Sequence, residues 1–169
     1  MVREVVGGLG ALVVALSACY YLTDVVRGRT RPHRASWAVW AVIGILGFGT
    51  ADVSGAGPGA WAAGVDAIAC VATFALSLHP RFGKPGARAS DAALGALALL
   101  GVALWRWGPL SITAAALLAV GCDAVALWPT VRESWHRPEL ESALSWSADV
   151  LGNGLCIAVA TGVSVAALA

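Results

Sequence analysis

The chain has 169 residues, of which 59% are hydrophobic and only 12% are Asp, Glu, Lys or Arg, and its formal net charge is +1. This charged share is about half of the roughly 25% that soluble domains carry, and the mean hydropathy is +0.77. The composition predicts one integral membrane domain, since a chain of this length holds about six spans of roughly 20 residues. Nucleic-acid binding is excluded, because the sequence has no basic patch of the size required.

Six apolar segments predict an all-α fold, a polytopic membrane helical bundle that occupies residues 1–169. The expected helices are about 5–26, 36–53, 59–78, 91–107, 110–129 and 143–166. The tryptophans support this count, because all of them lie near a predicted helix end or in a loop, where amphipathic rings meet lipid headgroups. They are Trp37, Trp40, Trp61, Trp105, Trp107, Trp128, Trp135 and Trp146.

The first apolar segment contains a short stretch, LSAC at 16–19, that resembles a lipoprotein cleavage box. A cleaved signal should have a basic start and be followed by a soluble domain. Here Arg3 is offset by Glu4, and further membrane segments follow. We therefore expect a retained first helix.

The basic residues predict the orientation of the bundle in the cell membrane. Nine of the eleven fall in the loops 27–35, 79–90 and 130–142, and the other two are Arg3 and Arg106. Because Lys and Arg are enriched in cytoplasmic loops, these three loops are expected in the cytoplasm and both termini outside.

Two stretches share the same sparse pattern, RPHRASWAVW at 31–40 and RPELESALSW at 137–146. Arg-Pro, a serine and a tryptophan recur at an offset of 106 positions, which predicts an internal repeat of the first and last helical hairpins in one orientation. In the first copy we expect Pro32 to break the helix, Ser36 to cap the next one, and Trp37 and Trp40 to anchor it at the lipid interface. A weaker echo, GVDAIA at 64–69 and GCDAVA at 121–126, pairs the third helix with the fifth.

Polar residues within the apolar helices are the candidate site. Asp66 and Asp123 lie inside predicted spans, and Asp149 and Asn153 are four residues apart, hence on one helix face. Acids within a membrane usually face the bundle interior and mark ion, proton or substrate pathways. The alternative is that these side chains only hydrogen-bond neighbouring helices.

Pro129 lies near the cytoplasmic end of the fifth predicted helix, in ALWPTVRESW. Because proline removes a backbone hydrogen bond, it either kinks the helix and serves as a hinge or simply ends it.

Motifs of enzymes, metal sites and cofactor sites are missing from the sequence. It has neither a nucleophile elbow, nor HExxH, nor a phosphate-cradling glycine loop, so no enzymatic activity is expected. The four cysteines, Cys19, Cys70, Cys122 and Cys156, are scattered singly in apolar stretches. We interpret them as packing residues, and we expect neither a metal nor a cofactor.

The segment ALWPTVRESWHRPELESALSW at 126–146, and more distantly YLTDVVRGRTRPHRASWAVW at 21–40, resembles the PQ-loop/SWEET-like superfamily of small membrane proteins. In that pattern a proline-kinked helix ends in a charged cytoplasmic turn and a serine opens the next helix. The chain departs from it in having Thr130 at the position of the glutamine, Thr23 and Asp24 at the first Pro-Gln pair, and six helices where the full-length form has seven.

The resemblance implies a solute pocket between two helical bundles, with Pro129, Trp146 and Asn153 at matching positions. Together with the intramembrane acids it favours a transporter-like protein that moves a small polar solute through the lipid bilayer, with proton coupling. The alternative is a non-transporting subunit or scaffold, because small residues suited to close helix contact are plentiful. A homo-oligomer or a partner membrane protein is compatible with both hypotheses.

Overall fold

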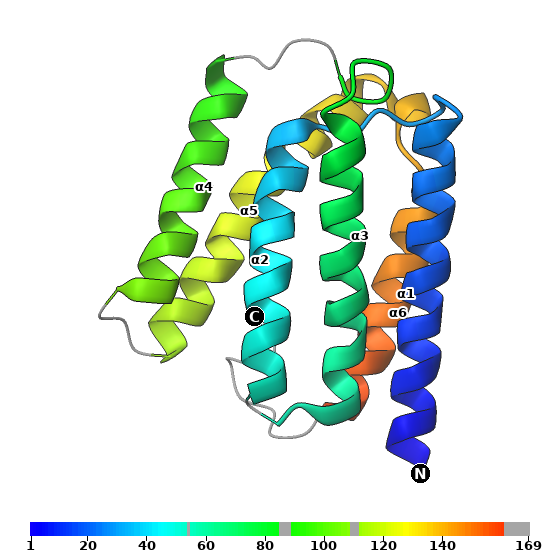
Figure 1. Cartoon of the computed structure of the whole chain (residues 1–169), viewed down its shortest axis with the longest axis vertical. Coiled ribbons are helices and arrows are strands. Elements are labelled where there is room, and N and C mark those ends of the chain that lie inside the picture. Colours follow the sequence, from blue (N-terminus) through cyan, green and yellow to red (C-terminus); the bar gives the residue numbers. More distant parts are fainter. Residues whose placement is uncertain (54, 85–88, 109–111, 161–169) are drawn as a thin grey trace.

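The computed structural model describes residues 1–53, 55–84, 89–108 and 112–160, and its regular elements in these ranges are all helical (Figure 1). The six α-helices are α1 (Val2–Val26), α2 (Arg34–Val53), α3 (Trp61–Ser77), α4 (Ala89–Trp107), α5 (Ile112–His136) and α6 (Ala143–Val159). Two short 3-10 helices precede α3 and α6, namely η1 (Gly57–Ala60) and η2 (Pro138–Leu140). The all-α class and the six predicted helices are confirmed.

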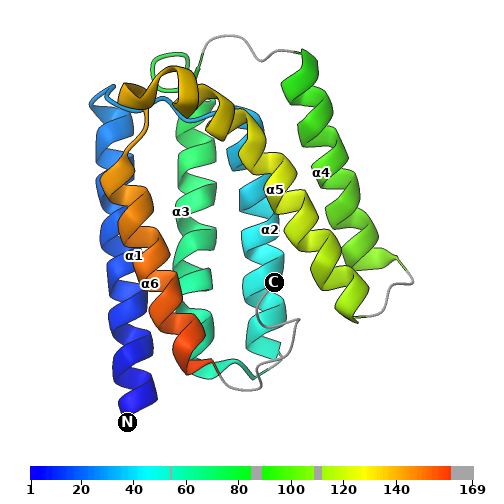
Figure 2. The same cartoon turned by 180° about the vertical axis from the view of Figure 1, so that it is seen from behind.

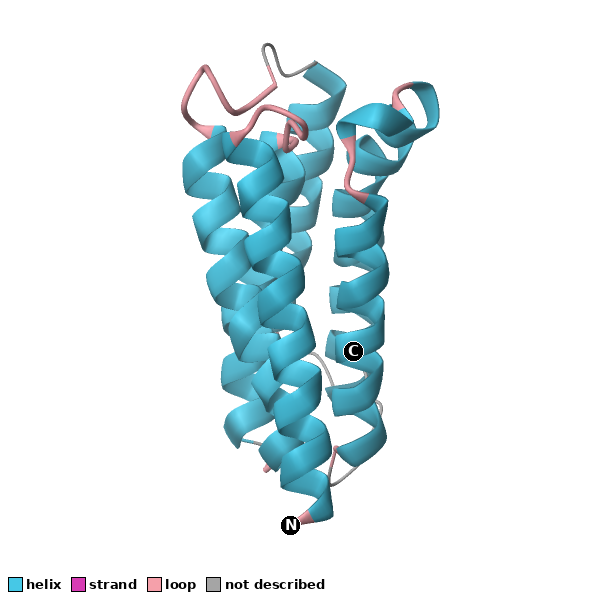
Figure 3. Cartoon of the chain, turned by 90° about the vertical axis from the view of Figure 1, so that its right-hand side faces the viewer, coloured by secondary structure: helices cyan, strands magenta, loops and turns pink. Residues whose placement is uncertain are grey.

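The helices run along a common long axis with their connections at the two ends (Figure 3). Helix α3 lies between α1 and α2 and packs against both, and α4 packs against α2 and α5. On the opposite face of this row, α6 packs on α1 and α5 crosses α2 obliquely (Figure 2). The consecutive helices α1 and α2, which α3 separates, therefore contact α5 and α6 through two helix pairs, α1–α6 and α2–α5.

Two helices are long and apolar enough to cross a membrane. Val2–Val26 has a hydropathy of 2.0, and Gly57–Ser77, which joins η1 to α3, has a hydropathy of 1.6. Arg34–Gly49 and Ala143–Val159 are shorter apolar helices. The described part of the chain thus holds two candidate membrane spans, defined by length and composition.

The described parts of the connections that follow α1, α3 and α5 lie at one end of the bundle, and the N-terminus lies at the other (Figure 1). The basic residues described in these connections are thus gathered at a single end.

Small residues bring α1 and α6 into backbone contact. A Cβ atom added to Gly10 would lie 2.7 Å from the Gly152 carbonyl oxygen, and one added to Gly152 would lie 2.7 Å from the Gly10 carbonyl oxygen. Further along the same pair, Ser17 Oγ donates to the Ser145 carbonyl at 2.7 Å and Ser145 Oγ donates to the Ser17 carbonyl at 2.9 Å. Close backbone approach and reciprocal hydrogen bonds therefore fix the register of this pair.

The interpretation of Pro129 as the end of the fifth helix is wrong, because α5 continues to His136. A proline removes one backbone donor and leaves the flanking helical bonds possible. Pro129 is buried, and Ser134 Oγ donates to the Thr130 carbonyl at 2.7 Å in the following turn. Asp123 consequently lies in the middle of a 25-residue helix and not near its end.

The predicted bounds of two other helices differ from the structure. Residues 59–60 belong to η1, because Gly55 and Gly57 adopt positive φ angles and Pro58 starts a tight 3-10 turn. Helix α6 ends at Val159, and Ala160 leaves the helical conformation with ψ 135°. The rest of the predicted sixth span, 161–166, lies outside the described residues.

Candidate functional site

Three of the predicted site residues form one hydrogen-bonded group between α3 and α6. Asn153 Nδ2 donates to Asp66 Oδ2 at 2.9 Å and lies 3.4 Å from Asp149 Oδ2. The same nitrogen lies 3.2 Å from the Asp149 backbone carbonyl. Because Asp149 and Asn153 are one helical turn apart, both side chains reach the same face of α6 and meet Asp66 there.

The negative charge of this group is met by an amide and not by a basic side chain. The two carboxyl groups interact directly with each other as well as with Asn153, and the segments of α3 and α6 contain no Lys, Arg or His. Two full negative charges side by side and away from bulk water repel each other strongly. The arrangement can hold a proton or another cationic group between the carboxylates.

Asp123 lies on α5 and does not join this hydrogen-bonded group. Its residue surface is exposed in the isolated chain, and its carboxylate interacts with the Trp40 indole of α2. The Cys70 thiol, one turn after Asp66 on α3, interacts electrostatically with Asp66, Asp149 and Asp123. The three acids, which come from three helices, are therefore all close enough to Cys70 to interact with its thiol electrostatically.

A layer of four aromatic rings lies next to the acids. It consists of Tyr21 from α1, Trp37 and Trp40 from α2, and Trp146 from α6, and we refer to it as the aromatic layer. The ring centroids of Tyr21 and Trp37 are 5.0 Å apart, and those of Trp40 and Trp146 are 5.8 Å apart. Trp37 also contacts Trp40 at 5.1 Å.

The expectation that Trp37 anchors α2 at the lipid interface is wrong, whereas Trp40 is half-buried against Trp37 and Trp146. Trp37 is only 7% exposed, because its ring packs against Tyr21 of α1 and Trp146 of α6. Four other tryptophans, Trp61, Trp107, Trp128 and Trp135, are exposed, as an interfacial position requires.

Glu141 lies between η2 and α6 and contacts the aromatic layer. Its Oε2 atom accepts a hydrogen bond from Trp146 Nε1 at 3.2 Å. Burial raises the pKa of Glu141 above its ordinary value, while the Trp146 bond and the Lys84 charge act in the opposite direction. Burial likewise lowers the pKa of Lys84, which pairs with Glu133 at 3.7 Å.

Several polar atoms beside Glu141 are buried without a hydrogen-bond partner among the described residues. They are Tyr21 Oη, Trp37 Nε1 and the second carboxylate oxygen, Glu141 Oε1. The Tyr21 hydroxyl nevertheless lies close enough to Trp37 and Glu141 to interact with both electrostatically. Such atoms are uncommon in folded proteins and call for an explanation.

Sequence reasoning missed Glu141 and Tyr21. Both lie near helix ends beside a charged loop, where a solvated surface is the usual expectation. The only available signal was the repeat, which places Glu141 and Trp146 in the second copy of the RP–S–W pattern.

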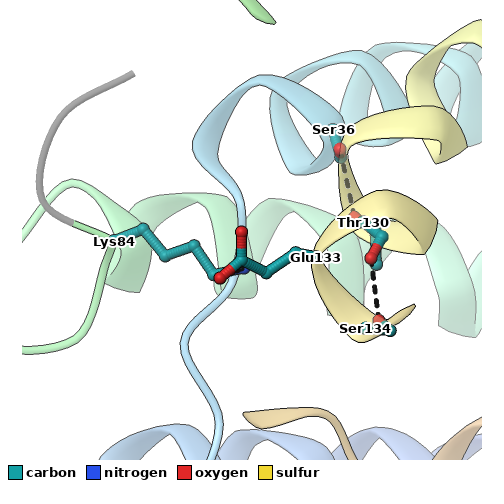
Figure 4. A network of polar contacts seen from close by, with 5 residues as sticks. All are labelled: Ser36, Lys84, Thr130, Glu133 and Ser134. Carbon is teal, nitrogen blue, oxygen red and sulfur yellow. Dashed lines mark hydrogen bonds and ion pairs between the residues drawn. The ribbon is translucent and has the colours of Figure 1, made fainter. Parts of the chain in front are cut away.

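Polar contacts tie the part of α5 that follows Pro129 to the rest of the bundle (Figure 4). Thr130 Oγ1 donates to Ser36 Oγ at 3.2 Å, and Glu133 pairs with Lys84. The expectation that Ser36 caps α2 is wrong, since α2 begins at Arg34 and Ser36 lies within its first turn. Ser36 is fully buried and meets α5 instead.

Replacing Glu141 by glutamine is expected to raise the melting temperature above neutral pH and to flatten its pH dependence. Glutamine keeps an oxygen for Trp146 and removes the charge that burial disfavours. Because the pKa of Glu141 is raised in the folded state, the folded protein binds more protons than the unfolded one. Stability therefore falls as pH rises from the ordinary pKa of 4.5 through the folded pKa. Thermal unfolding in detergent between pH 4 and 8 measures this effect.

Glu139→Gln is the matched control, since Glu139 is exposed in the same linker. This substitution should change neither the melting temperature nor its pH dependence. A lower melting temperature for E141Q at pH 8 would contradict the assignment of burial as the dominant cause.

Among the described residues no group of three or more His, Cys, Asp or Glu side chains is placed to hold a metal ion. Comparison of the chain with protein families, curated proteins and solved structures gives no match.

Proposed function

We propose that the chain is a multi-pass membrane protein that moves a small polar solute, with proton coupling at the Asp66–Asp149 pair. The observation that carries this proposal is the amide bridge from Asn153 to both carboxylates, which lies within apolar helices. Acids in such surroundings are costly and are typical of ion and substrate pathways.

The membrane setting is supported by the surface of the bundle. Large apolar side chains on α1, among them Leu9, Leu12 and Leu16, are more than half exposed. Only 28% of the apolar window of α1 and 22% of that of Gly57–Ser77 are buried within the chain. A soluble bundle would bury such helices against its core, whereas lipid accepts them. We extend this setting to all six helices, with the basic loops in the cytoplasm.

Proton coupling is supported by the close contact of Asp66 and Asp149. A carboxylate pair that shares one neutral donor binds a proton more readily than an isolated acid does, because protonation relieves the repulsion. Entry of a cationic or proton-bearing solute would compete with that proton. This competition is the simplest physical basis for coupled movement.

An internal repeat with PQ-loop/SWEET-like character is supported by the contacts of α1 and α2 with α5 and α6. If α1 corresponds to α5 and α2 to α6, the pair α1–α6 corresponds to the pair α5–α2, and both pairs pack. Residues equivalent under a two-fold axis meet where the axis passes between them. Trp40 and Trp146, which are 106 positions apart, contact each other in this way.

Pro129 is our proposed hinge within α5. The helical bond to the carbonyl four residues earlier is lost at a proline, and the residues after it are held to α2 through Thr130 and Ser36. A bend there would move the part of α5 that carries Asp123 relative to this anchored end.

Uptake into liposomes tests the proposal. The purified chain is reconstituted and screened with small polar solutes, with and without an inward proton gradient, and the internal pH is followed with a trapped dye. Solute-dependent acidification and gradient-driven accumulation are expected. Uptake equal to that of empty liposomes, together with co-purification of a stoichiometric foreign membrane protein in mild detergent, would favour the alternative of a non-transporting subunit.

A further inference from the structure

We propose that the aromatic layer is the cytoplasmic gate of the route past the acids, and that Glu141 holds this gate closed. The inference rests on the proposed function in so far as a route exists for the gate to control. It assigns roles to Tyr21, Trp37, Trp40, Trp146 and Glu141.

The aromatic rings lie to one side of the acids along the bundle. On α6, Trp146 precedes Asp149 by three residues, so the ring and the carboxylate lie on one helix face one turn apart. The ring lies on the side of the end that holds the basic loops. On α2, Trp40 contacts both the acids and the aromatic layer, since its indole interacts with Asp123 and its ring contacts Trp146. The aromatic layer therefore lies between the acids and the predicted cytoplasmic end.

The four rings of the aromatic layer contact one another. Tyr21, Trp37 and Trp146 meet pairwise at centroid distances of 5.0, 6.2 and 6.2 Å, and Trp40 adds contacts at 5.1 and 5.8 Å. Aromatic rings at such distances are in direct contact. Four rings from three helices thus join into an apolar layer, which opposes the passage of polar solutes.

The linker before α6 contacts the aromatic layer through Glu141. Glu141 accepts the indole N–H of Trp146 of α6 and interacts with the Tyr21 hydroxyl of α1, so it joins two helices of the layer. The groups that face Glu141 are Tyr21 from α1, Lys84 from the loop after α3, and Glu133 from α5, and Arg137 lies near Lys84.

Three buried polar atoms beside the aromatic layer lack well-formed hydrogen bonds. Tyr21 and Trp37 are more than nine-tenths buried, and Tyr21 Oη, Trp37 Nε1 and Glu141 Oε1 make no hydrogen bond of good geometry among the described residues, although the Tyr21 hydroxyl interacts with both Trp37 and Glu141. A buried polar atom without a partner destabilises the state in which it occurs. Separation of the rings would let water reach all three atoms, which lowers the free energy of opening. The closed layer is held by ring contacts, by the Trp146–Glu141 hydrogen bond and by the interaction of Glu141 with Tyr21, and it leaves buried polar atoms imperfectly paired.

Cys70 reports on this gate, because it lies beside the three acids and packs against the aromatic layer. A background with Cys19→Ser, Cys122→Ser and Cys156→Ala leaves Cys70 as the single thiol. A charged, membrane-impermeant maleimide is added to inside-out vesicles and, separately, to right-side-out vesicles. The rate of Cys70 labelling is measured in each.

Trp40→Ala combined with Trp146→Ala is expected to raise the labelling rate from the cytoplasmic face by about tenfold or more, since the layer then opens locally. Glu141→Ala should raise it in the same direction, and Glu141→Gln, which keeps an acceptor for Trp146, should stay near the unmodified rate. Trp135→Ala is the matched control, because Trp135 is 83% exposed and outside the layer.

Unchanged labelling from the cytoplasmic face, or an equal rise from both faces, would overturn the gate. Trp40→Phe with Trp146→Phe guards against loss of folding, because the restored rings should return the rate to its low value. The assay does not require transport. If the protein moves no solute but the variants raise Cys70 labelling from the cytoplasmic face, the proposed function is overturned and the gate stands. If coupled uptake is observed but the variants leave Cys70 labelling unchanged, the gate is overturned and the proposed function stands.

Discussion

Replacing Gly152 by leucine is expected to destabilise the folded protein by about 3 kcal/mol, the upper end of the usual cost of overpacking. A Cβ atom at this position would lie 2.6 Å from Val14 Cγ2, 2.7 Å from the Gly10 carbonyl oxygen and 2.9 Å from the Val14 backbone nitrogen. Two of these three neighbours are backbone atoms, which cannot rotate away. The α1–α6 pair can accept the larger side chain only by separating.

Thermal unfolding in detergent measures this effect, and Gly154→Leu is the matched control. Gly154 lies on the same helix, and nothing lies within 4 Å of an added Cβ there. Both substitutions replace a helical glycine by leucine and gain the same helix propensity, so their difference isolates the contact with α1. Equal melting temperatures for the two variants would show that α1 and α6 do not approach as closely as the structure has them.

Asp66→Asn and Asp149→Asn are each expected to lower proton-driven accumulation of solute by about tenfold for a gradient of one pH unit, since each coupled proton contributes one such factor. Asparagine has the shape of aspartic acid but cannot exchange a proton. Exchange of labelled for unlabelled solute without a gradient should be retained, because it needs binding and not coupling. Accumulation and exchange in liposomes are measured side by side.

Two further variants sharpen this experiment. Glu139→Gln removes an exposed acid of the linker and should leave accumulation unchanged. Asp123→Asn should reduce accumulation less than Asp66→Asn does, because Asp123 stays outside the group that shares Asn153. If the Asp66 and Asp149 variants accumulate solute like the unmodified protein, the carboxylate pair is only a helix-packing contact.

Hydropathy predicts the helices of this chain well, because each apolar segment is bounded by Gly, Pro or charged residues. It fails at Pro129, where tertiary packing overrides the helix-breaking tendency of proline. Buried Pro129 and the Thr130–Ser36 bond stabilise α5 beyond it, and neither contact is visible in a local pattern. It also fails at 59–60, where the positive φ angles of Gly55 and Gly57 produce a 3-10 turn.

The candidate site is predictable in its members but not in its grouping. Asp149 and Asn153 share a face because four residues make one helical turn, and this follows from the sequence. Their contact with Asp66 requires knowing that α6 crosses α3, which the sequence does not reveal. Tryptophans near helix ends are ambiguous for the same reason, since Trp37 turns inward and Trp135 outward at similar distances from a helix end.

The contact between α1 and α6 also constrains the order in which the bundle assembles. Ser17 and Ser145 are 128 positions apart, and Cys156 Sγ, which lies 3.4 Å from the Gly7 carbonyl, is 149 positions away from it. During synthesis α1 therefore cannot pack against its main partner until α6 has been made. Contacts of such sequence separation slow folding, so α3 is the natural early partner of α1. The arrival of α6 is then the step that completes the Asp66–Asp149 pair.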